Sequence, residues 1–139
     1  MVDKDVLIAK VNSIQRCLKR IQEVTDLDPN TLENLDTQEI FILNLQRAIQ
    51  SSIDLAAHVI ADEGLGVPTE LREHFDLLER AGVIKSEQSK KLRKMVGFRN
   101  IAVHEYQAID IDILKSILKH HLKDIENYYV AVLDYYNIN

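Results

Sequence analysis

Apolar residues recur along most of the chain at the three- and four-residue spacing of amphipathic α-helices. The first segment with this spacing extends from about Asp3 to Val24. One face of this segment collects the apolar residues Leu7, Val11, Ile14, Leu18 and Ile21. Pro29, in the DLDPN segment that follows, interrupts the pattern. The pattern therefore predicts a long N-terminal helix with one buried face.

A second helix is predicted from about Asp36 to Ala61. Asp36 and Glu39 have the D-x-x-E spacing of a capping box, which predicts the N-terminus of this helix. The apolar residues of the segment cover more than one face, so we expect a central helix that is contacted from several sides. The EGLGVP segment, with two glycines and a proline, ends it.

Three further helices follow. Thr69 is predicted to cap a short helix in the ELREHFDLLERA segment, and Gly82 to end that helix. A fourth helix begins near Ser86, and the last extends from about Asp110 to Tyr136. The stripe predicted to be buried on the last helix is Ile111, Leu114, Leu118, Leu122, Ile125, Tyr129, Val132 and Tyr136. This succession predicts an all-α fold, an up-and-down bundle of four to five helices.

Composition agrees with a single helical domain over residues 1–139. A chain of this length can bury a core of its own, and four glycines and two prolines are too few for a turn-rich β fold. Cys17 is the only cysteine, so no internal disulfide can form and a reducing compartment is expected. The N-terminus does not resemble a secretory signal, and no run approaches the roughly 18–20 apolar residues of a membrane span. We therefore expect a soluble, cytoplasmic protein.

The formal net charge of −5 argues against a general nucleic-acid-binding protein, because phosphate contacts depend on lysine and arginine. The charge is unevenly distributed, however. Residues 85–99 contain six basic residues and one acidic residue, a local charge of +5 that leaves −10 for the remainder. Lys91 and Lys94 belong to this basic stretch, which leads directly into the polar segment GFRNIAVHEY at residues 97–106.

Arg99 occupies an unexpected position in the fourth helix. At about 100° per residue, Arg99 falls in the middle of the apolar stripe. The other members of that stripe are Leu92, Met95, Val96, Ala102, Val103 and Tyr106. A buried arginine stays charged and needs partners or water. Three interpretations are open: Arg99 pairs with an acidic residue inside the bundle, it lines a polar cleft, or the helix ends before it.

His104 would point about 140° away from Arg99 in a continuous helix, so the two side chains could not share a site within one chain. Residues 101–103 include two β-branched residues, and Gly97 is a further weak point. A helix that loosens in this segment would allow His104 to turn toward Arg99.

The order Arg99, Asn100, His104 and Tyr106 resembles the R-x4-H-x-Y signature of the HEPN-domain superfamily. Within that superfamily the chain is most similar to the HepT-like ribonuclease toxins of type VII toxin–antitoxin systems. The chain length, the five-helix layout and the position of the motif before a long, tyrosine-bearing last helix agree with this family. The resemblance implies a HEPN-like homodimer that cleaves RNA without a metal or organic cofactor. It also implies an MntA-like nucleotidyltransferase as the cognate antitoxin.

The resemblance also implies a role for each residue of the motif. Arg99 and His104 would be the catalytic pair, and Asn100 would help to hold the arginine and the substrate. Tyr106 would be the tyrosine that the antitoxin adenylylates. The basic stretch, represented by Lys91 and Lys94, would attract RNA phosphates at the rim of the cleft.

These residue types suit RNA cleavage in which the substrate's own 2′-hydroxyl attacks the phosphorus and leaves a 2′,3′-cyclic phosphate. Histidine side chains transfer protons near neutral pH, and the planar fork of an arginine stabilises a negatively charged phosphorane. The motif supplies one histidine per chain, so an acid and a base together would come from two chains across a two-fold axis. AMP on Tyr106 would place bulk and negative charge beside Arg99.

Two other interpretations remain open. One is a non-catalytic helical module that docks on a nucleotidyltransferase and helps to bind its substrate. The other is a structural bundle in which Arg99 pairs with a carboxylate. The sequence contains no HExxH, CxxC, GxGxxG or P-loop pattern, which argues against metal hydrolysis, Rossmann cofactors and P-loop chemistry.

Overall fold

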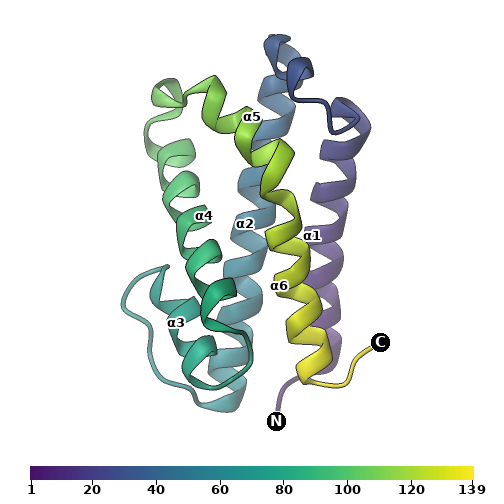
Figure 1. Cartoon of the computed structure of the whole chain (residues 1–139). Helices are drawn as coiled ribbons and strands as arrows, with labels where there is room; N and C mark the ends of the chain where they lie inside the picture. The colour runs from purple at the N-terminus through teal and green to yellow at the C-terminus, as the bar shows by residue number, and fades with distance from the viewer.

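The fold is built from α-helices that run up and down along a common direction (Figure 1). A computed structural model describes residues 1–139, the side chain of Ala108 excepted. The α-helices are α1 (Lys4–Thr25), α2 (Leu35–Glu63), α3 (Glu73–Arg80), α4 (Ser86–His104), α5 (Ile111–His120) and α6 (Leu122–Tyr135). Short 3-10 segments, η1 (Pro29–Glu33) and η2 (Tyr106–Ala108), precede α2 and follow α4. The prediction of an all-α, up-and-down bundle is confirmed.

The chain termini lie together at one end of the bundle, and η1 and η2 lie at the other (Figure 1). The central helix is α2, which packs against α1, α3, α4 and α6, as its several apolar faces predict. The short helix α3 packs beside α4 near the end that holds the termini. This topology places the C-terminal end of α4, with the GFRNIAVHEY segment, at the end of the bundle away from the termini.

The ends of the helices are set by local hydrogen bonds. The Asp3 side chain accepts hydrogen bonds from the backbone of the first turn of α1. The predicted capping box at Asp36 is wrong, because Asn34 is the N-cap of α2 and its side chain accepts from Thr37 N. The start predicted for α3 after Thr69 is also wrong: the Thr69 hydroxyl donates to the Glu73 carboxylate, and the helix begins only at Glu73.

The last predicted helix is divided into α5 and α6 at His121. The apolar stripe continues across the break through Leu118, Leu122 and Ile125, so the spacing of apolar residues gave no sign of it. The imidazole of His121 bonds the Asp124 carboxylate, with Nδ1 and Oδ2 3.0 Å apart. This side-chain contact lies in the first turn of α6, just after the break.

One cluster of buried apolar side chains includes residues of all the α-helices. Tyr128 on α6 is fully buried, and its hydroxyl donates to the backbone carbonyl of Ser52 on α2 at 2.8 Å. The ring of Phe75 on α3 packs edge-on against Tyr128, with the ring centres 5.5 Å apart. In the part of the chain that the structure describes, no helix combines the length and apolar character that crossing a bilayer requires.

Candidate active site at the C-terminal end of α4

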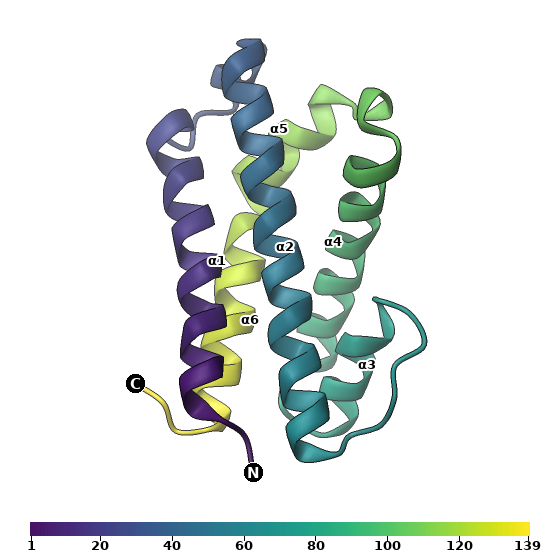
Figure 2. The same ribbon diagram turned by 180° about the vertical axis from the view of Figure 1, so that it is seen from behind.

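The residues of the motif lie on α4 and on the turn directly after it (Figure 2). Helix α4 packs against α2, α3 and α6, so one side of it contributes to the core and the other is exposed. We call the first the inward face, which comprises Leu92, Met95, Val96, Arg99 and Ala102. We call the second the outward face, which comprises Lys90, Lys94, Gly97, Ile101 and His104. The four apolar members of the inward face are buried, whereas Lys90, Lys94, Ile101 and His104 are exposed.

Arg99 lies half-buried on the inward face, as its position in the apolar stripe predicts. Its Nη1 donates to Oδ1 of the adjacent Asn100 at 3.2 Å, while its Nε is buried and has no hydrogen-bond partner. Among the described side chains no carboxylate lies within ion-pair distance of Arg99, and α4 continues beyond it. Both the internal ion pair and the early helix end are therefore wrong. The third interpretation, that Arg99 lines a polar cleft, stays a prediction.

His104 is the last residue of α4 and is exposed on the outward face. The helix is continuous from Ser86 to His104, so the predicted loosening that would turn His104 toward Arg99 is not observed. In a continuous helix the two side chains point about 140° apart, which agrees with one being half-buried and the other exposed. Within one chain, Arg99 and His104 therefore lie on opposite sides of the same helix.

Tyr106 is the first residue of η2 and is 46% exposed. The prediction that it belongs to the apolar stripe of the fourth helix is therefore wrong. Burial of its ring, together with the nearby Glu39 carboxylate on α2, raises the pKa of Tyr106 above its ordinary value. Val103 is also outside the stripe and is 40% exposed. The phenol of Tyr106 is thus accessible and protonated at neutral pH, next to the first turns of α2.

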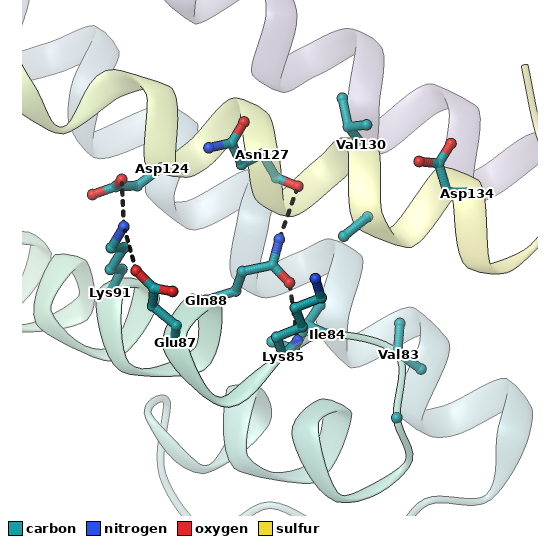
Figure 3. A pocket seen from close by; sticks show the side chains of 12 residues that line it. Val83, Ile84, Lys85, Glu87, Gln88, Lys91, Asp124, Asn127, Val130 and Asp134 are labelled. Carbon is teal, nitrogen blue, oxygen red and sulfur yellow. Dashed lines mark hydrogen bonds and ion pairs between the residues drawn. The ribbon is translucent and has the colours of Figure 1, made fainter.

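Lys91 and Lys94 of the basic stretch have different surroundings. The Lys91 ammonium lies 3.3 Å from Glu87 and 3.7 Å from the buried Asp124 of α6, as Figure 3 shows. Its hydrogen bond with Glu87, and then the charge of Asp124, raise the pKa of Lys91. Lys94 is exposed on the outward face, and no described carboxylate lies within ion-pair distance of it. The charge of Lys94 is therefore more available to a phosphate than that of Lys91.

A groove of about 550 Å³ lies between the N-terminal half of α4 and α6, with Lys91 and Asp124 at one end (Figure 3). None of Arg99, Asn100, His104 or Tyr106 lines it. A second groove, of about 490 Å³, lies between α4 and α5 and is lined by Gly97, Phe98 and Ile101 of the motif segment, but none of the four polar residues lines it either. The polar side chains of the motif therefore lie outside both of these grooves.

Arg72 is a charged residue next to α4 that the sequence did not indicate. It directly precedes α3, and its Nε donates to the backbone carbonyl of Arg93 at 3.3 Å. The contact joins residues 21 positions apart, and no local spacing pattern predicts it.

The chain was compared with known proteins. The family model described as ribonuclease HepT-like matches residues 14–132. The chain is 41% identical to the mRNA nuclease HepT of Shewanella oneidensis over 124 residues, which cover 89% of this chain and 93% of that protein.

Two solved structures share its fold at a TM-score of 0.88, and each alignment covers 94% of this chain and 98% of the other. One is a toxin–antitoxin crystal structure with AMP-PNP, at 39% identity. The other is the tri-AMPylated HEPN toxin of Shewanella oneidensis in complex with the MNT antitoxin, at 40% identity. The identity extends over nearly the whole chain, and the chain belongs to the HepT-like ribonuclease family.

Proposed function

We propose that this chain is a metal-independent endoribonuclease toxin that acts as a homodimer in the cytoplasm. Arg99 and His104 would act in a cleft between two chains, and a nucleotidyltransferase antitoxin would neutralise the toxin by adenylylating Tyr106. One observation supports this most directly: the motif lies exposed at one end of α4, with Arg99 and His104 on opposite sides of the helix. A second chain is needed to complete a site that uses both.

The surface around the motif supports dimerisation. Ile101 and Val103 are each 40% exposed and lie in the apolar run between Asn100 and His104 of the motif. Ile113, near the start of α5, is 51% exposed. Exposed apolar side chains close to charged ones are typical of protein interfaces. A two-fold axis near Ile101 would bring two copies of the motif together and supply two histidines and two arginines.

In the proposed reaction the ribose 2′-oxygen forms a bond to the adjacent phosphorus, and the bond from phosphorus to the 5′-oxygen breaks. One His104 imidazole accepts the proton of the 2′-hydroxyl, and the His104 of the second chain gives a proton to the departing 5′-oxygen. The products are a 2′,3′-cyclic phosphate and a 5′-hydroxyl end. Arg99, oriented by its bond to Asn100, stabilises the charge on the phosphorane.

Neutralisation by adenylylation is supported by the accessibility of Tyr106. The phenol is 46% exposed and lies two residues after His104, so a second enzyme can approach it. The added phosphate would carry negative charge to the end of α4, where it repels RNA phosphates and competes for Arg99 and Lys94. The solved relative that is tri-AMPylated and bound to an MNT antitoxin supports the same regulation here.

The catalytic proposal is tested by cleavage of a fluorescent RNA in the presence of EDTA. We expect the wild-type protein to cut RNA to products with cyclic phosphate ends, and Arg99→Ala and His104→Ala to lose this activity. His120→Ala is the matched control, because His120 is also an exposed histidine near the end of a helix. Full activity in both motif variants would refute the proposal. A wild-type protein that binds a nucleotidyltransferase but cuts no RNA would favour the non-catalytic alternative.

The regulatory proposal is tested by co-expression with the cognate MntA-like nucleotidyltransferase, followed by intact-mass measurement. We expect a mass gain of one or more AMP units that maps to Tyr106 and disappears in Tyr106→Phe. Tyr135→Phe is the control, since Tyr135 is 48% exposed and lies on α6. A fully neutralised toxin without added mass would exclude this mechanism.

A further inference from the structure

Arg72 lies across α4 at the position of Gly97. Besides the hydrogen bond from its Nε to the carbonyl of Arg93, its Nη2 lies 2.9 Å from the point where a Cβ on Gly97 would be. No other atom outside the local helix backbone lies within 4 Å of that point. The guanidinium therefore occupies the space that the absence of a side chain at Gly97 leaves open.

This contact gives a reason for a glycine inside a helix. Gly97 is in the interior of α4, and its φ angle is not positive, so its backbone conformation does not require glycine. A glycine at such a position weakens a helix relative to alanine, and a packing reason is the usual explanation for it. Here the close approach of Arg72 supplies that reason.

The charge of Arg72 is not neutralised within the described part of the chain. Arg93, to which Arg72 bonds, is paired with Asp76 at 3.2 Å, whereas no described carboxylate lies within ion-pair distance of Arg72. Arg72 is exposed, and of its five N–H donors only that of Nε has an acceptor there. A planar guanidinium with open donors suits the oxygens of a phosphate.

Arg72 also lies on the side of α4 that leads to His104. At about 100° per residue, Gly97 and His104 differ by about 20° around the helix, and Lys94 lies within about 60° of Gly97. The seven residues from Gly97 to His104 correspond to roughly 10 Å along the axis. A few nucleotides of a single RNA strand span that distance.

We propose that Arg72 is a substrate-binding residue that contacts an RNA phosphate a few nucleotides from the bond that is cut at His104. Gly97 is the positioning residue that allows the guanidinium to lie on the outward face. This inference rests on the proposed function for the identity of the substrate. Arg72 and Lys94 together would extend the phosphate-binding surface from the motif toward α3.

The first experiment measures RNA affinity by fluorescence anisotropy at several salt concentrations, with His104→Ala as a cleavage-inactive background. We expect Arg72→Ala to weaken binding several-fold at low salt and to reduce the salt slope by about 0.7 for each phosphate that the protein no longer neutralises. In the cleaving protein the same change should raise KM and leave kcat nearly unchanged. The control is Arg20→Ala, an exposed arginine on α1, which does not pack against α4.

The second experiment separates binding from stability by means of Gly97→Ala. The new methyl group would displace the end of the Arg72 side chain, while alanine favours the helix. We expect an unchanged or higher melting temperature together with a smaller loss of RNA affinity than in Arg72→Ala, because the flexible end of the Arg72 side chain can shift. The double variant should bind no more weakly than Arg72→Ala, because both changes act on one interaction.

Wild-type affinity and salt slope in both Arg72→Ala and Gly97→Ala would overturn the inference, whatever the outcome for cleavage. If wild-type protein binds RNA through Arg72 but does not cut it, the proposed function fails and the Arg72 site stands. If cleavage depends on His104 but not on Arg72, the proposed function stands and this inference fails. Absence of RNA binding by the wild-type protein would refute both the proposed function and the inference about Arg72.

Discussion

The two faces of α4 differ in what their residues contribute. On the inward face Leu92, Met95, Val96 and Ala102 are buried in the core, and Arg99 interrupts them with a charged side chain whose Nε has no partner. On the outward face Lys94 and His104 are exposed, and the space at Gly97 is occupied by Arg72. The residues of the motif are close together in the sequence, but Arg99 lies on the inward face of α4 and His104 on the outward face.

In the proposed function, this difference is the reason why a site that uses both Arg99 and His104 needs two chains. The fold holds Arg99 in place through the core and through Asn100, and it leaves His104 free to meet another molecule. The contribution of each residue can therefore be separated experimentally: changes on one face should alter cleavage, and changes on the other should alter stability. Arg99 is the exception and should alter both.

The largest effect is expected at His104. His104→Ala should reduce RNA cleavage roughly 10²–10⁴-fold, because a general acid or base is lost. The free energy of unfolding should change by less than about 0.5 kcal/mol, because the side chain is exposed. Cleavage of a labelled RNA and urea unfolding provide the two measurements.

Mixed dimers sharpen this first prediction. The proposed reaction uses the His104 imidazoles of both chains, one as base and one as acid. A mixed dimer of one wild-type chain and one His104→Ala chain keeps a single imidazole in the shared cleft, so it should be nearly as inactive as the His104→Ala dimer. Half of the wild-type rate, with dimer exchange verified, would indicate that each site lies within one chain.

A large effect on stability is expected from the inward face. Leu92 is fully buried, so Leu92→Ala should lower the free energy of unfolding by about 2–5 kcal/mol. Lys94→Ala, two residues further on, should change it by less than about 0.5 kcal/mol. Equal losses in the two variants, measured by urea unfolding, would mean that the faces are not distinct.

Arg99→Leu should have a smaller effect on stability, and of the opposite sign. Leucine completes the apolar stripe and removes a buried Nε that has no partner, so the free energy of unfolding should rise by about 1–2 kcal/mol. RNA cleavage should be lost at the same time. A lower melting temperature for Arg99→Leu than for wild type would show that Arg99 has a stabilising partner in solution.

The smallest effect concerns the titration of Tyr106. Because burial and the charge of Glu39 both raise the pKa of Tyr106, Glu39→Gln should lower that pKa toward its ordinary value and leave part of the shift. Absorbance of the phenolate against pH, with Tyr106→Phe used to identify this tyrosine among the five, measures it. An unchanged titration would show that burial alone sets the pKa.

Local sequence patterns predicted much of this fold and part of the site. The start of α4 at Ser86, the end of α3 just before Gly82 and the half-buried position of Arg99 follow from turn chemistry and helical spacing. The break at His121 did not follow, because the apolar stripe is continuous across it and only the contact with Asp124 marks the place.

Local sequence patterns could not predict contacts between segments that are far apart in the sequence. Arg72 lies 25 residues before Gly97 in the sequence and reaches it only because α3 packs against α4. Likewise, the sequence predicted that Arg99 and His104 follow each other on the fourth helix, but it did not decide whether that helix stays regular as far as His104. Its continuity to His104 is a property of the whole packed structure.

The buried Nε of Arg99, which has no hydrogen-bond partner, has a consequence for how the gene would change under selection. Cells that express a toxin without its antitoxin select substitutions that abolish cleavage, and most such substitutions also destabilise the protein. An apolar substitution of Arg99 should instead abolish RNA cleavage and raise the free energy of unfolding at the same time. Survivors of antitoxin-free expression should therefore be enriched in apolar substitutions of Arg99, as sequencing would show. Such an inactive toxin would remain folded and abundant, and it would still occupy the antitoxin.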